Sequence, residues 1–536
     1  MGKYILAYDI GTTGVKTCLF EVDSSIRLLS SASRSYRLYI LDGGGAEQDC
    51  DDWWTGMAES TAEVMRDAGE EVKPEMISGI SFCSQMQGLV LVDRDGIPVR
   101  RPMSYMDQRA SEEIKNGIAN GIQIAGANVS KLIKSLQITG AVAGSVKDPV
   151  WKYKWVEAHE PDKFAKVYKW LDVKDYLILR CTGNFTMTDD SAFGTLLYDI
   201  RPDGRCWSRE MCRMLGVNMS HLPDIIRSTD VAGYLTAAAA KDLGLAEGTP
   251  VYGGGGDASL IGVGAGATGT GDTHIYSGTS GWVITVTDKQ TVDVTSMIAA
   301  IVGADRTKYN YFAEMETAGK CLEWVKDHMA KDEIGIYVNQ EGVPADYESR
   351  NSQLYSYMTE VIRDVEPGSG GLLFAPWLHG NRCPFEDPSS RGVFIGIGID
   401  TGKTEMIHAV LEGVFYHLRW MLECQERKVK TSKVIRFVGG GALSPVGCQM
   451  LADILGRTLE TVESPQNVGS VGACAVTAVG LGIIPDIESV KDYVPVADTY
   501  YPDMDKHRAY KPYYKAFKKL YSSNKGLFRM LAKAGR

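Results

Sequence analysis

Two Gly-Thr phrases are the parts of this chain whose residue types and spacing best suit chemistry. The phrase DIGTTG occupies Asp9–Gly14, and the phrase SGTSG occupies Ser277–Gly281, about half a chain length later. Glycines expose backbone N–H groups and the hydroxyls add further donors, so each phrase suits an anion such as phosphate. Apolar runs on both sides predict that each phrase is the tip of a β-hairpin.

Two runs of glycine add a carboxylate and a second bare backbone. Gly253–Gly256 delivers Asp257, and Gly439–Gly441 is followed by Ala442. Consecutive glycines cost conformational entropy, and alanine would stabilise the chain unless the backbone has to stay bare. We therefore expect another group to approach both runs closely.

The elements that position these residues divide into two lobes, which we place at residues 1–245 and 246–536. The repeated hairpin and the alternation of strands with helices predict two α/β lobes. The expected elements are an Asp-capped helix from Asp51 to Met65, strands over Ile77–Phe82 and Leu89–Val92, a long helix from Ala110, a helix over Pro149–His159, and a C-terminal helix around Lys511–Lys519 whose Tyr514, Phe517 and Tyr521 dock on the second lobe.

Composition limits the classes of partner. A net charge of −10 and a pI near 5.5 argue against nucleic-acid binding and against binding to an anionic membrane surface. No apolar run reaches the roughly 18–20 residues of a membrane-spanning helix, and the first residues lack the apolar core of a signal peptide. We expect a cytoplasmic protein with a small anionic ligand, and a homodimer is compatible with this interpretation.

Two familiar motifs fail on their context. The segment Ile397–Thr404 ends like a phosphate-binding P-loop but has isoleucine where the first glycine is needed. Gly264–Gly269 fits G-x-G-x-x-G, yet it follows a helical stretch and leads into a strand, the reverse of a dinucleotide-binding turn. Neither motif therefore supports a dehydrogenase or a P-loop enzyme.

Taken together, the motifs resemble those of the FGGY carbohydrate kinases, a branch of the actin/Hsp70-like ATPases. The glycine phrases occur in that family's order, and Phe374–Trp377, Gly380–Pro384 and Arg391–Gly396 closely resemble one of its blocks. The resemblance implies two ribonuclease-H-like lobes with a cleft between them. It also implies phosphorylation of a sugar or polyol hydroxyl, with ATP and Mg²⁺ as cofactors.

Charge and resemblance together suggest a role for each candidate residue. Phosphoryl transfer needs a carboxylate that accepts the substrate proton, which we assign to Asp257, and a metal ligand, which we assign to Asp9. Asp257 could instead cap a helix, Lys16 could be a solvated strand residue, and Asp107 could pair structurally with Arg109. The expected nucleotide contacts are Gly11, Thr12, Thr13, Lys16, Gly278, Thr279, Gly319, Gly440, Gly441 and Ala442, and the expected sugar contacts are Gln85, Met86, Gln87, Tyr105, Asp107, Arg109 and Asp257.

Within the family the likeness is greatest to the xylulokinases, which implies D-xylulose and its 5-hydroxyl. The segments Gly45–Asp49, Ser84–Val90 and Asp107–Ala110 carry this likeness. Gln87 stands where those enzymes usually have histidine, and Ala258 where they usually have an amide. Ribulose, glycerol, gluconate and other polyols therefore stay open as substrates, and a non-catalytic actin- or Hsp70-like ATPase is the rival from another class.

Overall fold

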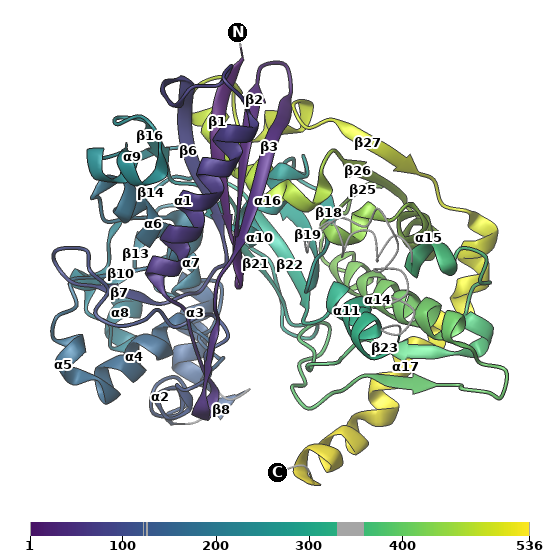
Figure 1. Cartoon of the computed structure of the whole chain (residues 1–536). Coiled ribbons are helices and arrows are strands. Elements are labelled where there is room, and N and C mark those ends of the chain that lie inside the picture. Colours follow the sequence, from purple (N-terminus) through teal and green to yellow (C-terminus); the bar gives the residue numbers. More distant parts are fainter. Residues whose placement is uncertain (1, 122, 125–126, 330–357, 535–536) are drawn as a thin grey trace.

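Two mixed β-sheets form the framework of two α/β lobes in the computed structural model of this chain (Figure 1). The structure describes residues 2–121, 123–124, 127–329 and 358–534. The first sheet runs in the order β15 (Val231–Tyr234), β16 (Pro250–Tyr252), β6 (Ile77–Ser84), β1 (Lys3–Ile10), β2 (Gly14–Val22) and β3 (Ile26–Ser35), and β17 (Gly255–Gly256) also pairs with β6. The second sheet runs in the order β20 (Val292–Asp293), β21 (Ile298–Val302), β22 (Tyr309–Met315), β19 (Gly281–Thr287), β18 (Thr273–Ser277), β25 (Val434–Val438), β26 (Thr458–Val462) and β27 (Val496–Tyr500).

Both sheets contain the predicted hairpin in the same surroundings. In the first lobe β1 pairs antiparallel with β2 and parallel with β6. In the second lobe β18 pairs antiparallel with β19 and parallel with β25. The α/β class and the two related lobes are therefore confirmed. The division at residue 245 stays a prediction, because β16 and β17 follow it in the chain and yet pair with β6.

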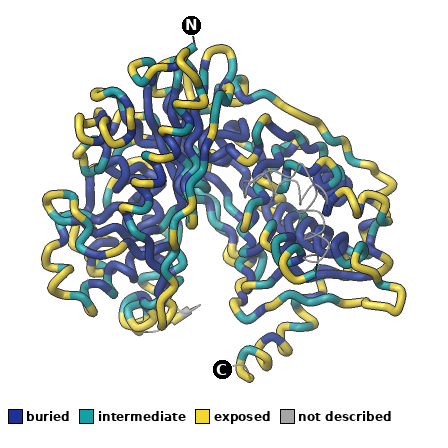
Figure 2. The backbone as a smooth tube through the Cα atoms, in the orientation of Figure 1, coloured by how far each residue is buried: buried dark blue, intermediate teal, exposed yellow. Residues whose placement is uncertain are grey.

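A pair of central helices joins the two sheets (Figures 1 and 2). α10 (Asp257–Gly264) packs against α16 (Val468–Gly480), and α16 also packs on β1 and β6. A Cβ at Gly264 would lie 1.9 Å from the Val468 carbonyl oxygen, and one at Gly472 would lie 2.1 Å from the Leu260 carbonyl oxygen. The two helix backbones therefore touch, which fixes the start of α10 relative to the first sheet.

The second lobe is built around the buried helix α14 (Lys403–Gln425), which packs on α11 (Gly319–His328), α15 (Pro445–Leu455) and β23 (Leu373–Ala375). The C-terminal helix α17 (Met504–Ala534) buries Tyr514 and Phe517 and packs on α14 and α15. The prediction that this basic segment docks on the second lobe is confirmed. Among the described residues, the structure has no helix with the length and apolar character needed to cross a membrane.

The first-lobe helices agree with the sequence except after Ala110. The described helices are α1 (Cys50–Asp67), α2 (Ser111–Asn116), α3 (Val129–Ile138), α4 (Pro149–His159), α5 (Pro161–Phe164), α6 (Val173–Thr182), α7 (Asp189–Gly194), α8 (Arg209–Leu215) and α9 (Ala237–Leu243). The long helix expected from Ala110 is wrong. Gly117 ends α2 with φ −89° and ψ −97°, and the short strands β8 (Gln123–Ile124) and β9 (Ala127–Asn128) precede α3.

Candidate active site

The first hairpin tip places Asp9 and Lys16 opposite one another on β1 and β2. The N–H of Gly11 donates to the carbonyl oxygen of Gly14 at 2.8 Å, which closes the turn. Burial raises the pKa of Asp9, and Lys16 opposes this effect. The Nζ of Lys16 also donates to a backbone carbonyl of the second half of the chain, that of Gln466, at 3.4 Å. The first tip therefore carries a buried carboxylate and a cation.

The turn before Asp257 is packed so tightly that side chains have no room there. Gly254 has φ +62°, and a Cβ on it would lie 2.2 Å from the Phe82 carbonyl oxygen. A Cβ on Gly256 would lie 2.2 Å from Cγ of Met86. The close approach expected for this glycine run is thus made by the neighbouring strand β6 and by Met86. Asp257 is the first residue of α10, and Gly256 takes the N-cap position.

The carboxylate of Asp257 lies in an acidic environment. Burial raises the pKa of Asp257 to about 7, and the negative charges of Asp9, Glu314 and Asp172 act in the same direction. The N–H of Ala258 donates to the Asp257 carboxylate at 2.7 Å and opposes this shift. A carboxyl group with a pKa near neutral pH can exchange a proton with a substrate at neutral pH.

Strand β6 separates Asp9 from the catalytic turn. Cys83 of β6 pairs with Asp9 on one side and with Gly255 on the other. Two strand spacings amount to about 10 Å, so the Asp9 and Asp257 backbones flank one end of β6. This spacing leaves room for a substrate group between the two carboxylates.

The second hairpin tip is brought together with the other expected nucleotide residues. The N–H of Gly319 donates to the carbonyl oxygen of Gly278 at 2.8 Å, so the start of α11 rests on this tip. A Cβ on Gly441 would lie 2.8 Å from Cβ of Ser277. Because β18 and β25 are parallel neighbours, the tip and the turn after β25 lie at the same end of the sheet. The members of this cluster are Gly278, Thr279, Gly319, Gly440, Gly441 and Ala442.

Gln85 and Tyr105 lie beside the first tip. Gln85 follows β6, and its Nε2 donates to the Gly11 carbonyl oxygen and to Oε1 of Gln48, each at 3.0 Å. The Oε1 of Gln85 is buried without a hydrogen-bond partner. The hydroxyl of Thr12 donates to the hydroxyl of Tyr105 at 3.4 Å. A buried acceptor without a partner is costly, so Gln85 is suited to accept a hydrogen bond from a ligand hydroxyl.

Gln87 is held in a left-handed backbone conformation, with φ +63°. Its N–H donates to Oδ2 of Asp172 at 3.0 Å, and the N–H of Gly88 donates to Oδ1 at 2.9 Å. Its carbonyl oxygen accepts from Nζ of Lys152 at 2.7 Å, and the same Nζ donates to the Ser104 carbonyl oxygen at 2.9 Å. The side chains of Asp172 and Lys152 are both buried, so two internal charges fix this strained residue.

Asp107 is used inside the first lobe. Its side chain is fully buried, and its Oδ2 accepts from the Ala46 N–H at 2.8 Å. Nη2 of Arg109 lies 2.7 Å from Oδ2 of Asp107 and 2.7 Å from Oε1 of Glu47, and its guanidinium stacks on Trp155. The structural pairing that the sequence left open is present, and direct substrate contact by Asp107 or Arg109 stays a prediction.

Sequence reasoning missed a group of charged residues from the second lobe. Arg382 binds Glu314 at 2.7 Å and Glu316 at 2.6 Å. Lys147 of the first lobe lies 3.8 Å from Glu316. Glu314 and Glu316 lie at the end of β22, whose partner β19 begins at the second tip. The alternation of the E-M-E triplet was the only local signal, and it does not name a partner.

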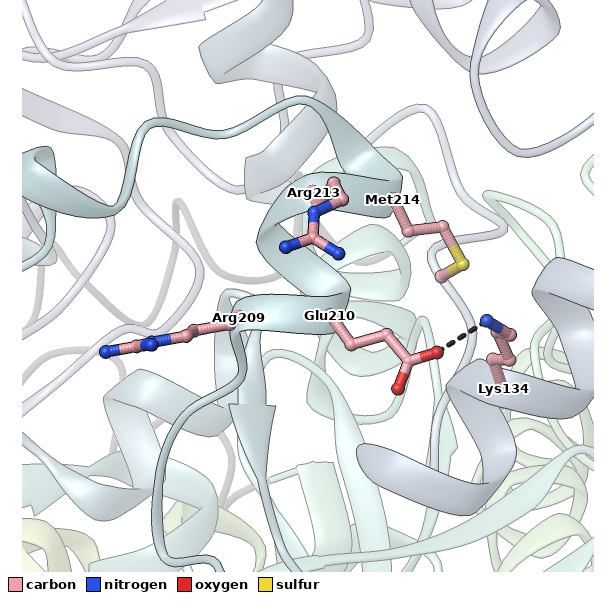
Figure 3. Close-up of a pocket in the computed structure, with 5 residues that line it drawn as sticks. All are labelled: Lys134, Arg209, Glu210, Arg213 and Met214. Atoms are coloured by element: carbon pink, nitrogen blue, oxygen red, sulfur yellow. Dashed lines mark hydrogen bonds and ion pairs between the residues drawn. The ribbon is translucent and has the colours of Figure 1, made fainter.

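A pocket of about 410 Å³ lies away from these residues, between α3 and α8 (Figure 3). Lys134, Arg209, Glu210, Arg213 and Met214 line it, and Lys134 forms an ion pair with Glu210. None of the residues expected from the sequence to bind nucleotide or sugar lines this pocket. The candidate site is therefore defined by the two tips and the Asp257 turn.

Two models of one protein family match this chain. The N-terminal domain of the FGGY family of carbohydrate kinases matches residues 4–264, and the C-terminal domain of the same family matches residues 274–481. The chain belongs to the FGGY family. It is a carbohydrate kinase, and the kinases of this family use ATP.

Relatives of this FGGY kinase carry more than one substrate name. A xylulose kinase of Staphylococcus epidermidis is 28% identical over 526 residues, 98% of each chain. A gluconokinase of Bacillus subtilis is 27% identical over 517 residues, 95% of this chain and 94% of the relative. The crystal structure of a ligand-bound xylulose kinase from Lactobacillus acidophilus superposes with a TM-score of 0.82 at 22% identity, covering 99% of this chain and 100% of the other. The structural likeness shows the shared fold.

Proposed function

We propose that this FGGY kinase transfers the γ-phosphoryl group of ATP to D-xylulose at its 5-hydroxyl, with Asp257 as the general base. The observation that carries the proposal is the buried Asp257 carboxylate with a pKa of about 7, on a glycine turn beside β6. A general base is most effective when its pKa lies near the working pH. Asp257 would accept the proton of the attacking hydroxyl as that oxygen bonds to phosphorus and ADP leaves.

The other residues of the chain would bind and orient the reactants. The backbone and hydroxyls of Thr12, Thr13 and Thr279 are suited to the phosphates, since the tips present donors on bare backbone. Gly440 has open space, because a Cβ on it would meet no atom within 4 Å. Gln85 would accept a hydrogen bond from a sugar hydroxyl at its unpartnered Oε1. Fixed reactant geometry then lowers the barrier to transfer.

Mg²⁺ fits the residues near the first tip. Asp9 offers one buried carboxylate, and the described residues contain no group of three or more His, Cys, Asp or Glu side chains that could hold a metal ion. Magnesium needs few protein ligands, because it keeps several waters and binds substrate phosphates. When bound, Mg²⁺ neutralises charge on the β- and γ-phosphates. We assign its protein ligand to Asp9.

The charges around Asp257 favour a neutral substrate over gluconate. Asp9, Asp172 and Glu314 already raise the pKa of Asp257, so an aldonate would bring one more negative charge into the same site. The two positive groups at the end of β22, Arg382 and Lys147, are already occupied by Glu314 and Glu316. A neutral ketose adds no charge, which agrees with the likeness to xylulose kinases.

The test measures ADP release by wild type and by Asp257→Asn with D-xylulose, D-ribulose, glycerol, D-gluconate and no sugar. We expect D-xylulose to give the highest kcat/KM, and Asp257→Asn to lower kcat about 100- to 10,000-fold. Asp199→Asn is the matched control, since this buried first-lobe carboxylate binds Arg201 and no site residue. Near-normal turnover of Asp257→Asn would refute the general base. Sugar-independent ADP release would favour the non-catalytic ATPase class, and preference for gluconate would refute the substrate.

A further inference from the structure

The glycine turn before Asp257 has a partner in the first lobe that the proposed mechanism does not use. Asp190 lies on α7, and its side chain is 1% exposed. Its Oδ2 accepts a hydrogen bond from the N–H of Gly256 at 2.7 Å. A Cβ on Gly255 would lie 3.0 Å from the same oxygen. One carboxylate oxygen therefore rests against the two residues that precede the proposed base.

The second oxygen of Asp190 fixes the direction of the first. Oδ1 accepts from the N–H of Ser191 at 2.9 Å and from the hydroxyl of Thr188. A carboxylate with donors on both oxygens is held in one rotamer, and hydrogen bonds to a charged acceptor are stronger than neutral ones. The bond to Gly256 is thus both charged and oriented.

Helix α7 is itself anchored from the second lobe. Asp189, next to Asp190, accepts from Nη2 of Arg306 at 2.6 Å and from the hydroxyl of Tyr198 at 2.6 Å. Arg306 lies between β21 and β22 of the second sheet, and α7 packs on β21 as well as on β17. The carboxylate that contacts the Asp257 turn therefore stands on an element held by both lobes.

We propose that Asp190 is a positioning residue that orients the Asp257 carboxylate through the N–H of Gly256. This proposal rests on the proposed role of Asp257 as general base. The backbone of the turn has no side chains of its own to resist movement, so an external hydrogen bond decides its setting. A displacement of about 1 Å at a reacting group costs about 100-fold in rate. Asp190 acts on turnover and not on the affinity for sugar or ATP.

Asp190→Asn is the decisive variant, because the amide keeps the shape of the side chain but cannot accept from Gly256 while it also accepts from Ser191. We expect kcat to fall about 10- to 100-fold, with both KM values within about threefold of wild type and with the melting temperature of the Asp199→Asn control. In the Asp257→Asn background the same change produces no further loss of kcat, because the two residues act through one group. A structural role would instead lower kcat in both backgrounds by the same factor.

Three results separate the possibilities. Unchanged kcat in Asp190→Asn, or an equal loss in both backgrounds, overturns the positioning role. Full activity of Asp257→Asn overturns the proposed function itself, whatever Asp190→Asn does. If Asp190→Asn fails to fold, Thr188→Val removes only the hydroxyl that orients Oδ1. We then expect a loss of kcat of about 3- to 10-fold at unchanged KM, and wild-type kcat in Thr188→Val overturns the proposal.

Discussion

Replacement of Gly254 by alanine tests whether the turn before Asp257 has to stay bare. Gly254 has φ +62°, and a Cβ would lie 2.2 Å from the Phe82 carbonyl oxygen of β6. A left-handed backbone costs an alanine about 1–2 kcal/mol. Relief of an overlap with packed atoms costs about 1–3 kcal/mol more. We therefore expect Gly254→Ala to lower the free energy of unfolding by about 2–5 kcal/mol.

Gly248→Ala is the matched control, because it isolates the backbone strain. Gly248 has φ +82°, and a Cβ on it would meet no atom within 4 Å, so only about 1–2 kcal/mol should be lost. Urea unfolding followed by tryptophan fluorescence measures both variants, and ADP release with saturating sugar measures kcat. Gly254→Ala should also lose about 100-fold in kcat, whereas Gly248→Ala keeps wild-type kcat. Equal losses of stability in the two variants, or normal kcat in Gly254→Ala, would refute the reasoning.

Two further predictions concern protonation and the sugar side of the site. Since a general base works only when ionised and the pKa of Asp257 is raised to about 7, kcat should fall about tenfold per pH unit below pH 7; a flat profile between pH 5.5 and 8 would contradict this. Lys152→Met removes the donor to the carbonyl oxygens of Gln87 and Ser104, so the KM for sugar should rise about tenfold or more at unchanged KM for ATP. An equal rise of both KM values would show that Lys152 serves the lobe as a whole.

The local motifs could be predicted because each one is short and its chemistry lies in adjacent residues. The hairpins β1–β2 and β18–β19 were recognisable from apolar runs around glycine and hydroxyl residues, and both are present. Helix α4 begins and ends at the predicted residues Pro149 and His159. The helix after Ala110 could not be delimited this way, since Gly117 ends α2 early and only its backbone angles show this.

The supporting charges could not be predicted, because their meaning depends on partners distant in the chain. Asp190 binds the N–H of Gly256, which is 66 residues away, and Asp172 binds the N–H of Gln87, which is 85 residues away. In the sequence, neither aspartate lies beside a glycine run or a hydroxyl phrase. Asp107 shows the opposite error: its setting in a resembling motif suggested sugar contact, whereas both of its oxygens bind within the first lobe.

The duplicated hairpins serve different ligands in our proposal because their parallel neighbours end differently. In the first lobe the neighbour is β6, and the chain continues into Gln85 and Gln87. In the second lobe the neighbour is β25, and the chain continues into Gly439–Ala442. Ligands of sheets with parallel strands bind beyond the carboxyl ends of those strands. The same hairpin beside polar side chains is therefore suited to sugar hydroxyls, and beside bare backbone it is suited to the flat face of a nucleotide, so the strand that follows each hairpin decides which substrate its lobe can hold.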